Sequence, residues 1–357
     1  MLLKRKKQEN KVIKNKKGFA IQFSWLFVLI GGAVILAFFF ALIKDVGHES
    51  EVESYSDLTK ELDNLLSISS ASRDTQKTVL FEEKINFVYD GTSRYYVEGS
   101  NIHREYNYNV IFSPFELKGR ELIIKTLVFE APFKVTPVLY LSNRDIEFVF
   151  SGSSSALNAV YTFMPDNLTT TYTDDIESYP DDDFFHTVFV VNESSLLTIL
   201  EEFRKPEGRV YAVVVSSGSG TVVEYGKLSF YHYNPSSGLF VYDGESPFLG
   251  SETLLGGVIS HDKNLYDSNL KKLMQRLELL SGLHLERVKH YYEHVPFAVC
   301  KQNYDGQPES ARNYLEDIRT YSGEEVSLDN FMILYAAITD LRILNNYLIT
   351  TECPFIY

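Results

Sequence analysis

The amino-acid sequence predicts an α/β protein with a single N-terminal transmembrane helix, a strand-rich segment, a Rossmann-like parallel sheet core and a helical C-terminal part. Three patterns predict it: a long uncharged apolar segment, a strand–helix–strand alternation in the middle, and leucine stripes at helical spacing toward the C-terminus. Apolar residues make up 45% of the chain and charged residues 23%, which argues against disorder throughout. We expect six segments: a basic cytoplasmic tail (1–17), a transmembrane helix (18–43), a stalk and linker (44–76), a strand-rich segment (77–142), an α/β core (143–249) and a helical C-terminal part (250–357).

The segment from Gly18 to Ile43 predicts a retained membrane anchor. It holds 26 residues without a charge, and such a helix, at about 1.5 Å per residue, crosses a hydrocarbon core of about 30 Å. A cleavable secretory signal has a shorter apolar region and a small-residue cleavage site. We therefore expect the lipid bilayer as a partner. Ala33, Ala37 and Ala41 are spaced four residues apart and so share one face of the helix. Small residues on one face predict helix–helix association in lipid, although alanine is also simply common in such helices.

Charge is spread unevenly along the chain. Residues 1–17 carry eight basic side chains and one acidic, a net charge of +7, so the other 340 residues carry −21 and the total is −14. By the positive-inside bias, the N-terminus is expected in the cytoplasm and the body outside it, in a cell-membrane protein that crosses once. An acidic body argues against nucleic-acid binding, which needs a basic footprint.

The middle of the chain predicts a parallel sheet. Strand-like apolar runs at Ile146–Phe150, Thr187–Val191 and Val210–Val215 alternate with two helical patterns, at Ala156–Met164 and Leu196–Phe203. Strand, helix and strand, twice over, is typical of right-handed crossovers. Near-continuous apolar strands fit a sheet that is covered on both faces.

The two cysteines, Cys300 and Cys353, fall at the ends of C-terminal helices. On the outer face of a membrane thiols oxidise and persist as disulfides, so we expect a bridge between them. A loop of about 50 residues is worth roughly 4 kcal/mol on the chain-entropy estimate. The alternative is a pair of free, buried cysteines.

Two serine- and glycine-rich loops are candidate ligand sites. Gly152, Ser153 and Ser154 lie between a predicted strand and helix, where backbone N–H groups can cradle an anion. Ser217 and Gly218 follow the carboxyl end of a strand, where open α/β sheets bind ligands. Neither loop has a dinucleotide or P-loop motif, so plain turns are the alternative and we expect no cofactor.

A possible metal motif lies on a C-terminal helix. His290, Glu293 and His294 form an H-x-x-E-H pattern, the arrangement of inverted zinc peptidases. Pro296 ends this helix and few residues follow that could supply a third ligand, so we expect no zinc and no catalytic residues. Asn167 and Asn192 begin N-x-[ST] sequences and are glycosylation candidates in an extracytoplasmic body.

Five short stretches of the sequence carry a family resemblance: Phe23-Ser24-Trp25, Ile111-Phe112-Ser113-Pro114, Leu117-Lys118-Gly119, Pro132-Phe133-Lys134-Val135-Thr136 and Cys353-Pro354-Phe355-Ile356-Tyr357. Through them the chain resembles a group of membrane-anchored archaeal proteins of uncharacterised function. This resemblance implies a common architecture and no particular activity. Through Lys16-Lys17-Gly18 the N-terminus also resembles that of archaeal type IV pilins, although Phe23 stands where pilins carry a glutamate.

Together these patterns predict a membrane-anchored extracytoplasmic binding or assembly protein without catalytic activity. The first alternative is a pilin-like filament subunit, cut after Gly18, and the second is a zinc peptidase. Because pilins need the glutamate to neutralise a neighbouring amino terminus, we expect the basic tail to be retained.

Overall fold

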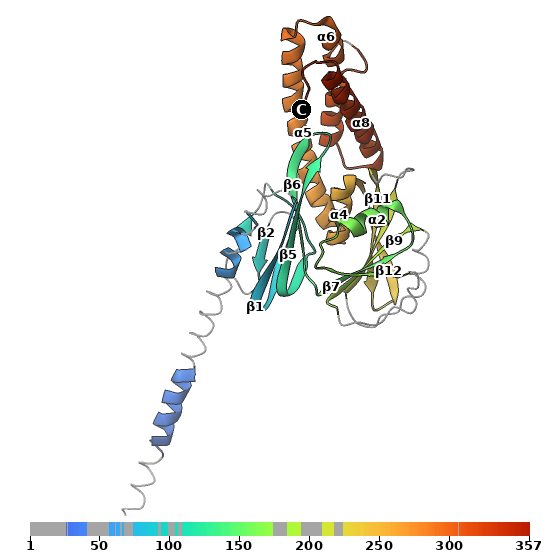
Figure 1. Cartoon of the computed structure of the whole chain (residues 1–357). Coiled ribbons are helices and arrows are strands. Elements are labelled where there is room, and N and C mark those ends of the chain that lie inside the picture. Colours follow the sequence, from blue (N-terminus) through green and yellow to red (C-terminus); the bar gives the residue numbers. More distant parts are fainter. Residues whose placement is uncertain are drawn as a thin grey trace, which may run out of the picture. The chain divides into compact units, whose positions relative to one another are not determined.

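The computed structural model describes residues 26, 28–40, 57–60, 62–64, 66–67, 74–91, 94–98, 104–105, 109–173, 184–193, 209–217, 224–305 and 307–357 (Figure 1). The chain divides into two compact units, Met1–Ser54 and Tyr55–Tyr357. The second unit holds all the strands described below and the helices from α2 to α8.

The prediction of a transmembrane helix at residues 18–43 is wrong. Among the described residues, the structure contains no helix with the length and apolar character needed to span a membrane. The longest described helical stretch in the first unit is 28–40. The predicted single-pass localisation is therefore corrected as well. Ala33 and Ala37 lie in this stretch, Ala41 lies outside the described residues, and their pairing with a second helix stays untested.

The strand-rich segment forms a six-stranded sheet, called the first sheet. Its order is β3-β2-β1-β5-β6-β4, and all neighbours are antiparallel except β4 and β6. The long strands β1 and β5 pair with a register shift between Leu80 and Ile85. The bounds are β1 (Thr75–Tyr89), β2 (Arg94–Val97), β3 (Arg104–Glu105), β4 (Val110–Phe112), β5 (Glu116–Glu130) and β6 (Lys134–Ser142).

The second sheet also has six strands, in the order β12-β11-β10-β9-β7-β8. Four of them, β8, β7, β9 and β10, run parallel, whereas β11 and β12 are antiparallel to their neighbours. The Rossmann-like parallel core is thus corrected to a mixed sheet, because the hairpin of β11 and β12 extends it. The bounds are β7 (Ile146–Ser151), α2 (Ser155–Phe163), β8 (Thr169–Tyr172), β9 (His186–Asn192), β10 (Arg209–Ser217), β11 (Tyr225–Asn234) and β12 (Leu239–Leu249).

Both faces of the second sheet are buried. On β9, Val188 and Val190 belong to the main hydrophobic core, while Phe189 and Val191 belong to a smaller cluster that includes Val214 of β10. Alternate residues of a strand point to opposite faces of the sheet. Because each face packs against a hydrophobic cluster, successive residues of the strand are apolar and the sequence shows one continuous apolar run. This explains why these strands show no alternation of apolar and polar residues.

The C-terminal helices join the two sheets. Helix α4 contacts strands of both sheets, and α5 begins there and extends into a helical region with α6, α7 and α8 (Figure 1). Asp262 caps the start of α5 by accepting a hydrogen bond from Leu265 N at 2.9 Å. The bounds are α4 (Gly250–Ser260), α5 (Lys263–His294), α6 (Ala298–Tyr304), α7 (Ala311–Gly323) and α8 (Leu328–Thr350).

The predicted disulfide is confirmed. Cys300 of α6 is bonded to Cys353, just beyond α8, with their Cα atoms 5.7 Å apart. The Tyr304 hydroxyl donates to the carbonyl oxygen of Pro354 at 2.5 Å, so a hydrogen bond ties the same two segments together. The bridge closes a loop that spans 53 positions of the chain.

Candidate functional site

The first predicted ligand loop lies where the chain order of the parallel strands reverses, between β7 and β9. Gly152 follows β7 with φ +99°, and a Cβ placed on it would lie 2.9 Å from the Asn192 carboxamide. Only glycine adopts this backbone without strain and leaves this space. Ser154 is occupied locally, because its hydroxyl accepts a hydrogen bond from Leu157 N and caps α2. The loop occupies the edge at which open sheets bind ligands, but a ligand role for it stays a prediction.

The second predicted loop lies on the same edge. Ser217 is the last residue of β10 and is exposed, and Gly218 lies outside the described residues. The preceding Ser216 donates a hydrogen bond to a carboxylate oxygen of Glu193 at 2.5 Å. The structure therefore gives no further support to Ser217 and Gly218 as ligand contacts.

The H-x-x-E-H motif lies at the end of α5. The rings of His290 and His294 stack with centroids 4.2 Å apart, and His294 Nδ1 donates to the His290 carbonyl oxygen. Throughout the described part of the chain, no group of three or more His, Cys, Asp or Glu residues is placed to hold a metal ion. Among these residues, His290, Glu293 and His294 are therefore not arranged as a metal site.

The two glycosylation candidates differ in their surroundings. Asn167 is exposed, and its carboxamide donates to Thr78 Oγ1 at 3.1 Å. Asn192 is partly buried against Gly152. A glycan would have to displace this contact at Asn192, and the hydrogen bond to Thr78 at Asn167. Glycosylation of either residue stays a prediction.

The candidate functional site lies at the opposite edge of the second sheet, where β9 and β10 begin. A pocket of about 360 Å³ opens there between the sheet and the turn that joins α4 to α5. We call it the His232 pocket. Its lining residues are Arg209, Val210, Tyr211, His232, Tyr233, Pro235, Asp243, His261, Asp262, Lys263 and Asn264.

Strand pairing brings the floor of this pocket together. Tyr211 of β10 is paired with His232 of β11. Tyr231 and Phe230 of β11 pair with Tyr242 and Gly244 of β12, so Asp243 of β12 is the extra residue of a β-bulge. A bulge re-aims a side chain, and here it directs Asp243 toward the imidazole.

His232 and Asp243 form a close pair. The Nδ1 atom of His232 lies 2.7 and 2.8 Å from the two carboxylate oxygens of Asp243. A carboxylate only accepts hydrogen bonds, so Nδ1 carries a proton and Nε2 is the other polar atom of the ring. The bulge continues at Gly244 with φ +122°, where a Cβ would lie 2.7 Å from the side chain of Lys263.

His261 closes the pocket from the α4–α5 turn in a left-handed conformation. Its φ is +40°, and its backbone N–H donates to the Gly257 carbonyl oxygen at 2.9 Å and ends α4. Glycine is the usual residue at such a helix end. The imidazole is 3% exposed, and its Nδ1 donates to Ile259 O, so Nε2 is an acceptor whenever the ring is neutral.

A second buried histidine lies behind the pocket wall. His186 is the first residue of β9 and pairs with Arg209 of β10. Its ring centroid lies 5.3 Å from that of His261 and 5.4 Å from that of Tyr211. Neither ring nitrogen has a hydrogen-bond partner in the described part of the chain.

Burial keeps both buried imidazoles neutral. Desolvation, followed by the charge of Arg209, lowers the pKa of His186 to about 3. Desolvation, followed by the proximity of His186, lowers the pKa of His261 well below its usual value. Burial also raises the pKa of the Tyr211 hydroxyl. These side chains therefore act near neutral pH as uncharged hydrogen-bonding groups.

The two cations of the pocket are held in ion pairs. Arg209 binds a carboxylate oxygen of Glu116 at 2.5 Å, and its guanidinium lies over the ring of Phe185 at 5.2 Å from the centroid. Lys263 binds Asp267 at 2.5 Å, and Asp267 also accepts a hydrogen bond from the Ser246 hydroxyl. Ion pairs within the protein therefore fix the positions of the Arg209 and Lys263 side chains.

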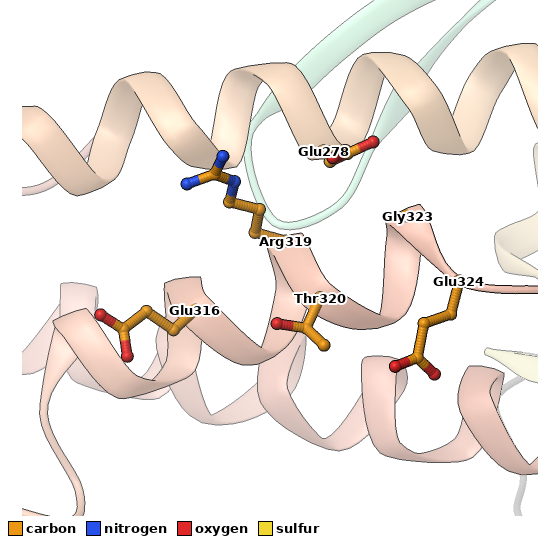
Figure 2. Close-up of a pocket in the computed structure, with 6 residues that line it drawn as sticks. All are labelled: Glu278, Glu316, Arg319, Thr320, Gly323 and Glu324. Atoms are coloured by element: carbon orange, nitrogen blue, oxygen red, sulfur yellow. The ribbon is translucent and has the colours of Figure 1, made fainter.

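A different hollow lies on the C-terminal helices, between α5 and α7. Figure 2 shows Arg319 of α7 pointing toward α5. The carboxyl group of Glu278 of α5 lies beside α7, because a Cβ placed on Gly323 would be 3.1 Å from it. The hollow has a volume of about 570 Å³, and all of its lining residues except Glu278 are exposed. It holds no buried polar side chain among the described residues, in contrast to the His232 pocket with His261.

Sequence reasoning missed the His232 pocket. Its residues come from β10, from the β11–β12 hairpin and from the α4–α5 turn, and no short motif contains them. The only local signals are Asp243-Gly244 inside a strand pattern, which is typical of a bulge, and a histidine between two helical segments, where glycine or asparagine is usual.

Comparisons with protein-family models, curated proteins and solved structures found no match to this chain. The resemblances to archaeal anchored proteins and to type IV pilins therefore stay predictions. The pilin alternative depends on residues 16–23, which lie outside the described residues.

Proposed function

We propose that this chain is a binding protein, without catalytic activity, that holds a small polar molecule in the His232 pocket. Small-molecule sites are concave, have volumes of about 300–1,000 Å³ and combine aromatic side chains with a few convergent polar groups. The pocket has a volume of about 360 Å³ and combines Tyr211, His232 and His261 with two carboxylates and two cations.

The observation that carries the proposal is the conformation of His261. A non-glycine residue at φ +40° strains the backbone, and such strain is found where the side chain serves a purpose. Glycine would end α4 there without strain. His261 lines the pocket and is almost fully buried, so we take the role of its imidazole to be a contact with the bound molecule.

The lining of the pocket favours binding over catalysis. His232 and Asp243 form a pair of the kind that general-base enzymes use. Among the described residues that line the pocket, however, there is no Ser, Thr or Cys that this pair could activate as a nucleophile.

The test uses the full chain and a protein-free metabolite extract. After incubation and washing, the protein is denatured and released molecules are identified by mass spectrometry. Asn264→Trp fills the pocket rim from an exposed position in the first turn of α5, and Gln275→Trp is a matched exposed change further along this helix.

We expect one small molecule to be retained, close to one per chain, by the unchanged protein and by Gln275→Trp but not by Asn264→Trp. Retention of no molecule, or equal retention by Asn264→Trp, would contradict the proposal.

A further inference from the structure

The charges around the His232 pocket are already satisfied within the protein. Arg209 is paired with Glu116 and Lys263 with Asp267, each at 2.5 Å. Asp243 is bound by His232 at 2.7 Å, and Asp262 accepts a hydrogen bond from the start of α5. A charged ligand would have to displace one of these partners, which leaves a partly desolvated charge behind.

The balance of these groups also disfavours an anion. The lining holds two cations and two carboxylates, and Glu116 and Asp267 stand directly behind the cations. With His232 protonated, the sum over these groups is still −1. A phosphate or carboxylate ligand would therefore enter against the local potential.

Several hydrogen-bonding groups of the pocket are, by contrast, uncommitted. Within the described chain, neither the Tyr211 hydroxyl nor the Asn264 carboxamide has a hydrogen-bond partner. Nε2 of His261 is an acceptor, because Nδ1 carries the proton that is donated to Ile259 O. The pocket thus offers both donors and acceptors that the protein does not use, and ligand hydroxyls match such a mixture, since each hydroxyl both donates and accepts.

Aromatic rings supply the apolar part of the lining. The rings of Tyr211 and His261 lie with centroids 4.4 Å apart, and Tyr233 contributes a third ring from β11. Such rings present an apolar face beside a polar edge, and they suit a ligand with both C–H and O–H surfaces.

We infer that the His232 pocket binds an uncharged, hydroxyl-rich small molecule of monosaccharide size. This inference rests on the proposed binding function and names the class of its ligand. The paired charges act in it as fixed, planar hydrogen-bonding groups. The guanidinium N–H groups of Arg209 that do not bind Glu116 donate to ligand hydroxyls, and the remaining lone pairs of the Asp243 carboxylate accept from them.

The experiment compares neutral and charged sugars on the full chain by titration calorimetry. The probes are three neutral hexoses (glucose, galactose and mannose), glucosamine as the cationic analogue and glucuronate as the anionic analogue. We expect at least one hexose to bind at least tenfold more tightly than either charged analogue. Its affinity should change less than twofold between about 0.05 and 0.5 M salt, because screening acts on charged pairs.

Variants locate the binding. Asn264→Trp should abolish it and Gln275→Trp should leave it unchanged, while Tyr211→Phe, which keeps the ring and removes only the hydroxyl, should weaken it about tenfold. Hexose binding that persists in Asn264→Trp would overturn the inference.

Failure of the inference is distinct from failure of the proposed function. If a charged analogue binds more tightly than the hexoses and Asn264→Trp removes it, the pocket binds a ligand but the class is wrong. If no probe binds and the metabolite that the pocket retains is charged or carries no hydroxyl groups, the class is again wrong and the binding function stands. A retained metabolite that is uncharged and rich in hydroxyls would support the class. If no probe binds and no metabolite is retained, both the ligand class and the proposed binding function are contradicted.

Discussion

The imidazole of His261 packs against the ring of Tyr211 with the ring centroids 4.4 Å apart. This contact joins the α4–α5 turn to the start of β10, and it depends on a histidine backbone at φ +40°. The contact and the strain can be separated by substitution, because glycine and alanine both remove the ring but differ in their freedom to adopt this backbone.

His261→Ala should be less stable than His261→Gly by about 1 kcal/mol, because an L side chain is disfavoured in the left-handed region. Urea denaturation of both variants at one pH measures the difference. Equal stabilities would mean that the turn relaxes to another conformation. Both variants should also lose binding in the His232 pocket.

Stability should fall as the pH is lowered from 6.5 toward 3. His186 has a pKa of about 3 when folded, through burial and then Arg209, against 6.5 as its ordinary value. The unfolded chain therefore binds a proton in this window that the folded chain does not, which costs about 2 kcal/mol at pH 5 relative to pH 8.

His186→Phe removes this titration and keeps a ring beside Tyr211 and His261. Urea unfolding at pH 8 and at pH 5 should show a smaller loss for the variant than for the unchanged protein, by about 2 kcal/mol. Part of the loss remains in the variant, since burial lowers the pKa of His261 in the same direction. Identical losses in the two proteins would contradict the assignment to His186.

Asn269→Ala should destabilise the protein by roughly 3 kcal/mol. The buried oxygen Oδ1 of Asn269 accepts hydrogen bonds from the Tyr89 hydroxyl at 3.0 Å and from Ile111 N at 3.2 Å, so one side chain of α5 binds two strands of the first sheet. Removing it leaves two buried donors without an acceptor.

Tyr89→Phe is the matched control for this network. It deletes one donor, and Oδ1 of Asn269 still accepts from Ile111, so the loss should be about 1 kcal/mol. A loss in Tyr89→Phe as large as that in Asn269→Ala, measured by urea denaturation, would contradict this account, because Phe keeps the ring and removes a single donor.

Replacing both Cys300 and Cys353 with alanine should lower the free energy of unfolding by about 4 kcal/mol, since the bridge closes a loop of 53 positions. The fully reduced natural chain should show a similar loss in thermal and urea denaturation. Unchanged stability in both samples would mean that the Tyr304–Pro354 hydrogen bond and the surrounding packing hold the chain terminus without the bridge.

The apolar pattern of the sequence was sufficient to predict much of the second sheet. The runs at Ile146–Phe150, Thr187–Val191 and Val210–Val215 coincide with β7, β9 and β10, because strands buried on both faces have to be apolar throughout. The cysteine pair was also predictable, since only one pairing of two cysteines exists. The prediction of a membrane helix was wrong: an apolar run shows how readily a segment leaves water, but the described residues contain no helix with the length and apolar character needed to span a membrane.

The His232 pocket was decided by tertiary structure. Strand pairing places Tyr211 beside His232, a bulge turns Asp243 toward that imidazole, and a left-handed turn between two helices adds His261. Each relationship joins residues distant in the chain or depends on a backbone conformation that propensity disfavours. Composition and periodicity report which face of an element is buried. Only packing decides which polar side chains from different elements meet, and there the local preference of His261 is overridden.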